Sequence, residues 1–117
     1  MNNWFFENSQ KAIPIGENVY VFDVGGDAHP DILFRHSERG YHNFINDSKE
    51  IVYNDTLLIV KSIDEDDTLK FVYHKITPIN DSINYDNIKD RLEKISEKDF
   101  IKYNQECQQC SKKIFKK

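Results

Sequence analysis

The segment from residue 55 to residue 76 constrains the fold of this chain more than any other. Residues 56–62 form an almost continuous apolar run, and residues 68–76 alternate between apolar and polar side chains. The acidic turn at residues 63–67 separates the two runs and holds four consecutive carboxylates. Two such runs joined by a polar turn are typical of a β-hairpin. We therefore predict a hairpin whose first strand is covered on both faces and whose second strand has one face in solvent.

Shorter strands are expected before this hairpin. Residues 18–24 are mostly apolar and predict a strand, and the glycines at 25–26 permit a turn with positive φ. Residues 31–36 should pair back on that strand. Two further short strands are expected at residues 41–45 and 50–53. Strands at this spacing predict a meander-like, mostly antiparallel sheet of about five strands.

The last third of the chain has a different periodicity. Ile88, Leu92 and Ile95 recur at the spacing of one helical face. Side chains at this spacing lie above one another on a helix. The pattern therefore predicts a helix over residues 86–95.

A second helix is expected to begin at Ser96. Ser96 and Asp99 resemble a capping box with Asp in place of the usual Glu. The apolar stripe of this helix comprises Phe100, Tyr103, Cys107, Cys110 and Ile114. We expect an α+β fold in which two C-terminal helices pack on one face of the sheet. Residues 1–117 form a single domain in this interpretation, β-rich over 1–79 and helical over 85–114.

The net charge of −4 is unevenly divided along the chain. Residues 1–88 hold 7 Lys and Arg against 15 Asp and Glu, whereas residues 89–117 hold 9 against 5. An acidic body repels phosphates, which argues against nucleic acid as its partner. The basic C-terminal stretch is typical of a solvated chain end.

No part of the sequence predicts membrane insertion or export. No run approaches the roughly 20 apolar residues that a membrane span needs. Residues 1–7 lack the basic region of a signal peptide. We therefore expect a cytoplasmic location without a membrane partner, in which the two cysteines are reduced.

A loop after the first predicted strand carries the string Asp27-Ala-His-Pro-Asp31. It resembles the Asp-Ala-His-x-Asp segment of the arginase-like ureohydrolases, a family in which such carboxylates and the histidine hold manganese. The resemblance covers five residues, and the second aspartate-rich motif and far larger α/β fold of that family have no counterpart in this sequence. The weak metal-ligand candidates are Asp23, Asp27, His29 and Asp31. A Gly-Gly turn with Asp and Pro in loop roles is the simpler interpretation, so we expect no metal or cofactor.

Cys107 and Cys110 have the spacing of half a zinc site or of a redox pair. A structural zinc needs four ligands, and the sequence has no second pair of cysteines. A thioredoxin-type pair begins a helix, whereas these two fall late in the predicted one. We therefore interpret them as packed free thiols, with zinc and redox roles as alternatives.

The sequence contains no recognisable catalytic constellation. The histidines are not paired with a nucleophile at an elbow, and no glycine-rich phosphate loop opens a helix. We expect that the protein is not an enzyme.

The acidic turn is then the strongest candidate for a functional surface. It is either a solubilising turn or a docking surface for a cationic partner protein. The predicted partner-binding residues are Asp64, Glu65, Asp66 and Asp67, extended by Asp55, Glu50 and Asp47 if these loops lie at the same end of the sheet.

An acidic domain of this size favours a small protein inhibitor. Our first hypothesis is a bacterial immunity protein that blocks a toxin with a basic, nucleic-acid-acting site. The alternatives are a phage- or plasmid-encoded inhibitor of a host defence protein and, in another class, a ligand- or metal-binding module that uses residues 23–31.

Overall fold

The computed structural model describes residues 12–23, 29–37, 40–80, 83–84, 86–107 and 109–115, with nine strands in two antiparallel sheets. The first sheet has the order β1-β2-β3-β4, with β1 (Ala12–Pro14), β2 (Val19–Phe22), β3 (Asp31–Ser37) and β4 (Gly40–Ile45). The second has the order β8-β7-β6-β5-β9, with β5 (Ser48–Tyr53), β6 (Leu58–Ile63), β7 (Phe71–Ile76), β8 (Leu92–Ile95) and β9 (Ser111–Ile114). The described helices are α2 (Ile88–Arg91) and α3 (Glu97–Glu106). The α+β class and the antiparallel pairing are confirmed.

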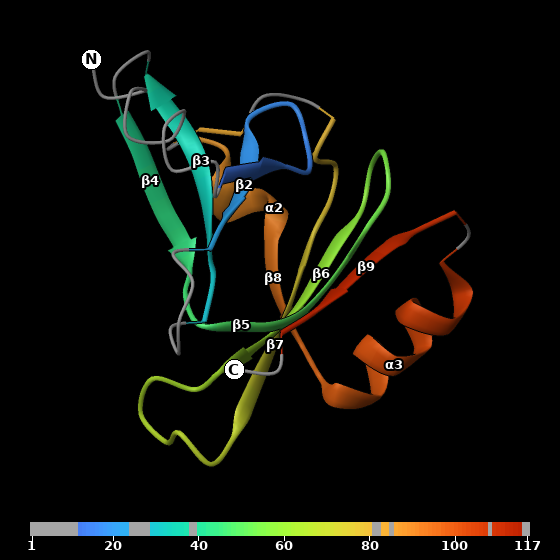
Figure 1. Ribbon diagram of the computed structural model, residues 1–117. Helices are drawn as coiled ribbons and strands as arrows, with labels where there is room; N and C mark the ends of the chain where they lie inside the picture. The colour runs from blue at the N-terminus through green and yellow to red at the C-terminus, as the bar shows by residue number, and fades with distance from the viewer. Residues whose placement is uncertain are drawn as a thin grey trace.

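The elements form three layers, with the second sheet in the middle (Figure 1). A large apolar cluster fills the space between the two sheets. Its buried members are Ile15, Val19, Val21, Ile32, Phe34, Ile45, Ile51, Leu58, Val60, Ile76, Ile79, Ile83 and Ile88. A smaller cluster lies between the second sheet and α3, and its buried members are Val52, Ile59, Tyr73 and Phe100.

Strand β6 is covered on both faces, as its sequence predicts. Leu58 and Val60 enter the cluster between the sheets, whereas Ile59 enters the cluster under α3. All three side chains have 0% exposure. Successive side chains of a strand point to opposite faces, so a strand without a polar face needs a layer on each side.

The pairing of β2 with β3 also follows the prediction. Val19 lies opposite Phe34, and Val21 lies opposite Ile32. The proposed glycine turn at residues 25–26 lies outside the described residues. At the edge of this sheet, Pro14 ends the three-residue strand β1, a place where a missing N–H is tolerated.

The helix expected over residues 86–95 is only one turn long. It ends at Arg91, and the chain continues as strand β8 beside β7. Leu92 packs against the cluster between the sheets, whereas Ile95 packs against the cluster under α3. Two residues three apart lie on one face of a helix but on opposite faces of a strand, and this strand serves both clusters.

The second predicted helix begins as expected but ends early. The Ser96 hydroxyl accepts a hydrogen bond from the Asp99 N–H at 3.0 Å, which confirms the cap. The helix ends at Glu106, so the predicted stripe does not continue through Cys110 and Ile114. The chain there forms β9, which pairs with β5 at the sheet edge. Of the two described helices, α3 alone covers the outer face of the second sheet, because α2 places Ile88 in the cluster between the sheets.

Two leucines of the same hairpin test the importance of the doubly covered strand. Leu58 has 0% exposure and Leu69, in the β6–β7 loop, has 91%. We expect Leu58→Ala to lower the free energy of unfolding by about 2–5 kcal/mol, because it leaves a cavity in the core. Leu69→Ala should change it by no more than about 0.5 kcal/mol. Urea denaturation followed by circular dichroism measures both, and equal effects would contradict the burial of β6.

Candidate functional site

The β6–β7 loop, residues 64–70, is built by its own carboxylates. The Asp64 carboxylate accepts from the Asp66 N–H at 2.9 Å, and the Asp67 carboxylate accepts from the Leu69 N–H at 3.1 Å. The Asp64 N–H donates to the Lys70 carbonyl at 3.0 Å. These local bonds are typical of Asp in turns. Asp64 and Asp67 therefore stabilise the loop by hydrogen bonds and also contribute to its negative charge.

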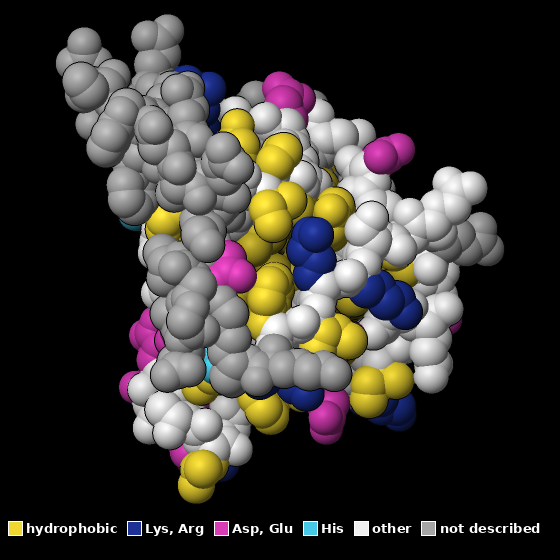
Figure 2. Space-filling view, in the orientation of Figure 1, with side chains coloured by type: hydrophobic (Ala, Val, Ile, Leu, Met, Phe, Trp, Pro, Cys, Tyr) yellow, Lys and Arg dark blue, Asp and Glu magenta, His cyan; other side chains and the backbone are white. Residues whose placement is uncertain are grey.

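Two other segments bring carboxylates to the same place. The Ile63 N–H donates to the Asp47 carbonyl at 3.0 Å, and the Asn46 amide donates to Glu65 at 3.4 Å. Asp31, at the start of β3, accepts from the Asp47 N–H at 3.2 Å and from the Asn43 amide at 3.1 Å. We call the set of Asp31, Asp47, Asp64, Glu65, Asp66 and Asp67 the acidic end. Figure 2 shows acidic side chains at its lower left, where Figure 1 places the β6–β7 loop.

An open cavity of about 530 Å³ lies within the acidic end. The described residues that line it are Asp31, Asn43, Asn46, Asp47, Ile63, Asp64, Glu65 and Thr68. This lining contains four carboxylates and no Lys or Arg. The arrangement favours a cationic group over an anionic one.

The pKa of the Asp31 carboxyl is raised above its usual value. Burial is the main cause, and the charge of Asp47 adds to it. The hydrogen bonds from the Asp47 N–H and the Asn43 amide act in the opposite direction without cancelling the rise. A carboxylate that is disfavoured in this way would gain from a nearby positive charge.

Glu50 and Asp55 do not join the acidic end. Glu50 lies on β5 and accepts a hydrogen bond at 3.2 Å from Asn104 of α3. Asp55 follows β5 at the other end of the β5–β6 pair, since Tyr53 faces Leu58 there while Ser48 faces Ser62 near Asp47. Asp47 is thus the member of the predicted extension that meets the loop.

The four weak metal-ligand candidates are not assembled in the described part of the chain. Asp23 follows β2, Asp27 lies outside the described residues, and Asp31 belongs to the acidic end. His29 has a buried Nδ1 without a hydrogen-bond partner among the described residues. No group of three or more His, Cys, Asp or Glu residues in the described ranges is placed to hold a metal ion.

A second cavity, of about 210 Å³, lies beside the acidic end, between the two sheets. We call it the inter-sheet cleft. Its described lining is Phe44, Ile45 and Asn46 of the first sheet and the loop after it, with Ser62, Ile63, Asp64, Glu65, Asp66, Val72 and His74 of the β6–β7 hairpin. The sequence assigns no role to Ser62, and it offers His74 neither a nucleophile partner nor the ligand spacing of a metal site. One sequence signal for Ser62 exists: it lies two positions after Val60 on the apolar strand, so it faces the same core between the sheets.

The pKa of the His74 imidazole is lower than that of a free histidine, which favours its neutral form. Burial lowers its pKa, and the charge of Lys94, directly opposite on β8, lowers it further. A histidine with a lowered pKa in the folded state stabilises the fold above its unfolded pKa, 6.5, and loses that contribution as the pH falls through the folded value.

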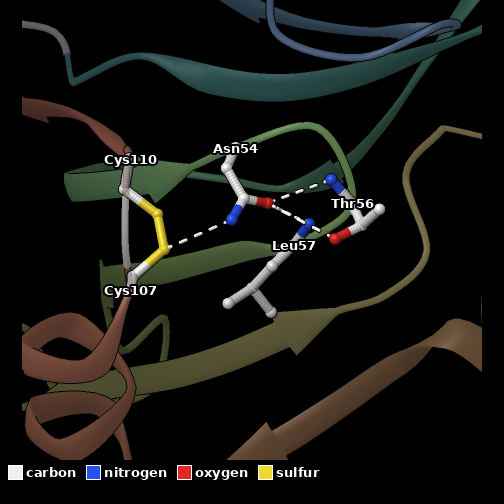
Figure 3. The surroundings of a disulfide bond; sticks show 5 residues. All are labelled: Asn54, Thr56, Leu57, Cys107 and Cys110. Atoms are coloured by element: carbon white, nitrogen blue, oxygen red, sulfur yellow. Dashed lines mark hydrogen bonds between the residues drawn. A yellow bond between two sulfur atoms is a disulfide. The ribbon is translucent and has the colours of Figure 1, made fainter.

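The two cysteines form a disulfide, which corrects the expectation of packed free thiols (Figure 3). Because α3 ends at Glu106, a short turn follows, and the Cα atoms of Cys107 and Cys110 lie 5.8 Å apart. Asn54 donates to the Cys107 sulfur at 3.6 Å, and its carbonyl oxygen accepts from the Leu57 N–H at 2.9 Å. The disulfide therefore lies beside the β5–β6 turn, at the other end of the hairpin from the acidic end.

The described helices include none with the length and apolar character that a membrane crossing requires.

The lowered pKa of His74 predicts a specific pH dependence of stability. We expect the unfolding midpoint of the wild type to fall as the pH drops below about 6.5, because unfolding then takes up a proton. His74→Gln should reduce this fall, and Lys94→Gln should reduce it partly. Thermal unfolding across this range measures the effect, with histidine NMR titration as a direct check. An unchanged profile in His74→Gln would contradict the assignment.

Comparisons with known proteins do not assign a family: no family model, curated protein or solved structure matches this chain.

Proposed function

We propose that this protein is a small acidic inhibitor that binds a basic partner protein through the acidic end. The observation that carries the proposal is the convergence of carboxylates from three separate segments. Asp31 begins β3, Asp47 lies between β4 and β5, and residues 64–67 belong to the β6–β7 loop. Lys70 pairs with Asp67 at 3.8 Å, but the described lining of the open cavity holds four carboxylates and no Lys or Arg. Gathering these like charges is unfavourable for the isolated protein, and an opposite charge would relieve this.

The partner that fits best is a bacterial toxin that acts on nucleic acid, which makes the protein an immunity protein. The active site of such a toxin must attract phosphates, so it carries positive charge. A hydrogen-bonded loop of carboxylates can occupy that site as a phosphate mimic. Opposite charges also raise the association rate well above the ~10⁵–10⁶ M⁻¹s⁻¹ of a neutral pair. A phage- or plasmid-encoded inhibitor of a host defence protein would use the same surface.

A tagged pull-down from cells that express the neighbouring genes tests the proposal. The bound proteins are eluted first at low and then at high salt and identified by mass spectrometry. We expect a stoichiometric basic protein that is released by salt, because screening weakens exposed charge pairs. If the gene of that protein is a neighbour and encodes a toxin, the immunity role is supported. Recovery of no basic protein would refute the inhibitor proposal.

Neutralising the loop should slow association with this partner. We expect the combined Asp64→Asn, Glu65→Gln, Asp66→Asn and Asp67→Asn variant to lose on the order of tenfold in association rate at low salt, with a smaller loss at high salt. Asn at 64 and 67 retains a side-chain oxygen for the loop hydrogen bonds, so folding should be preserved. Stopped-flow or surface plasmon resonance measures the rates.

A second variant with the same change in net charge serves as the control. It combines Asp86→Asn, Asp90→Asn, Asp99→Asn and Glu106→Gln, at exposed positions around the helices. We expect its association rate to stay within about twofold of the wild type. Equal slowing of both variants would mean that net charge, and not the acidic end, guides the encounter.

A further inference from the structure

The inter-sheet cleft contains buried polar atoms that lack partners. Ser62 has 2% exposure and lines the cleft, and its hydroxyl has no hydrogen-bond partner among the described residues. The same holds for Nδ1 of His74, which also lines the cleft. Ser48 lies directly opposite Ser62 on β5 with 0% exposure, and its hydroxyl is likewise unpartnered within the described part of the chain. Buried polar groups are nearly always hydrogen-bonded to protein or to an ordered water, so this cluster marks a place where a water or a ligand group supplies the remaining bonds.

These atoms share one face of the second sheet. Ser62 lies opposite Val72, and His74 follows two positions later on β7, opposite Val60. Alternate residues of a strand point to the same face, so the two serines and His74 all face the first sheet. Phe44 and Ile45 form the opposing wall. Ser62 and His74 therefore lie on one wall of the cleft, and Ser48 lies opposite Ser62 without belonging to the described lining.

The lining of the cleft is amphipathic and acidic. Phe44, Ile45 and Val72 supply apolar surface, whereas Asp64, Glu65 and Asp66 supply carboxylates. No Lys or Arg belongs to its described lining. Hydroxyl oxygens accept hydrogen bonds, and so does Nδ1 of a neutral imidazole that carries its proton on Nε2. The ligand should therefore be a cationic donor with an apolar stem.

The size of the cleft limits the occupant to a small group. Its volume of about 210 Å³ is below the ~300–1,000 Å³ of pockets that hold drug-sized ligands and cofactors. Lysine and arginine side chains have both required features, an aliphatic stem and a charged head with several N–H donors.

We propose that the inter-sheet cleft is an anchor pocket for one lysine or arginine side chain of the basic partner protein. The head group donates to the Ser62 hydroxyl and to Nδ1 of His74, the stem packs on Phe44, and Asp64 and Glu65 balance the charge. The assignment of the cation to a protein partner rests on the proposed function. It is favoured because the cleft lies beside the acidic end and shares Asn46, Ile63, Asp64 and Glu65 with the open cavity there. Buried anchors of this kind dominate the energetics of many interfaces.

The first test uses small probes and needs no partner. The full-length protein, labelled with ¹⁵N, is titrated with n-butylguanidinium and with n-butylammonium. We expect saturable shifts of the amides at residues 62, 72 and 74 and of the His74 ring, and none with n-butanol, which lacks the charge. Shifts confined to residues 64–67 would overturn the proposal, since they would show charge attraction at the surface only. Equal binding of n-butanol, or no shift with either cation, would also overturn it.

Variants of Ser62 connect the shifts to the cleft. Ser62→Val should weaken probe binding by at least about tenfold, because it removes the hydroxyl and narrows the cleft. Ser62→Ala removes the hydroxyl alone and should fold at least as stably as the wild type, since this hydroxyl has no partner to lose. Ser111→Val, at an exposed position of β9, is the matched control and should bind the probes as the wild type does. Unchanged probe binding by both Ser62 variants would overturn the proposal.

The partner protein provides the second test. We expect Ser62→Val to raise the dissociation rate of the complex by about 10–100-fold and to leave the association rate within about twofold, because an anchor acts after the encounter. Neutralising residues 64–67 should mainly lower the association rate. Failure of the anchor pocket, which changes dissociation, is therefore distinguishable from failure of the proposed function, which changes association. If the probe cations bind the cleft but Ser62→Val leaves the dissociation rate of the complex unchanged, the cleft binds free amines and not a side chain of the partner protein. Cation binding without any protein partner would refute the proposed function as well.

Discussion

The burial of β6 on both faces is the constraint on which the rest of the structure depends. Leu58 and Val60 need an apolar layer on one side and Ile59 needs one on the other, so neither the first sheet nor α3 is dispensable. This requirement orders the molecule into three layers. It also fixes the functional end, because β6 ends at Ile63, where the charged loop begins and the cleft lies between the two sheets.

The sequence predicts those parts of the fold in which local pattern and tertiary role agree. The apolar run of β6 and the cap at Ser96 are examples. The expectation that β7 has one face in solvent is wrong, because Tyr73 is buried under α3 and Ile76 is buried between the sheets. Prediction fails at residues 92–95, because the spacing of Leu92 and Ile95 satisfies a helix with one apolar face or a strand between two cores equally well. The choice depends on β7, whose free edge accepts this strand, and no local pattern contains that information. The polar strand β9 is likewise stabilised by its pairing with β5 and not by its own composition.

The candidate site could be predicted only where its residues are neighbours in sequence. Residues 64–67 are evident as a run of charge, but their meeting with Asp31 depends on the hydrogen bond from the Asp47 N–H, which joins positions sixteen residues apart. Asp55 is nearer in sequence to the loop than Asp31 is, yet one strand length separates it from the acidic end. Ser62 and His74 carry no motif at all. A serine in a strand becomes informative only when burial and the absence of a partner are known together.

The charged loop and the inter-sheet cleft affect the stability of the free protein differently. Carboxylates at an exposed loop attract a cationic partner before contact, and water and salt limit the unfavourable repulsion among them. An unpartnered hydroxyl in the core acts only on contact and disfavours the folded state of the free protein. A protein selected for stability alone would have Ala or Val at position 62, next to Val60 on the same apolar face. Local rules of folding are broken most often at functional sites. The serine at this position fits the proposed binding event, in which its hydroxyl accepts a hydrogen bond from the cationic group of the partner.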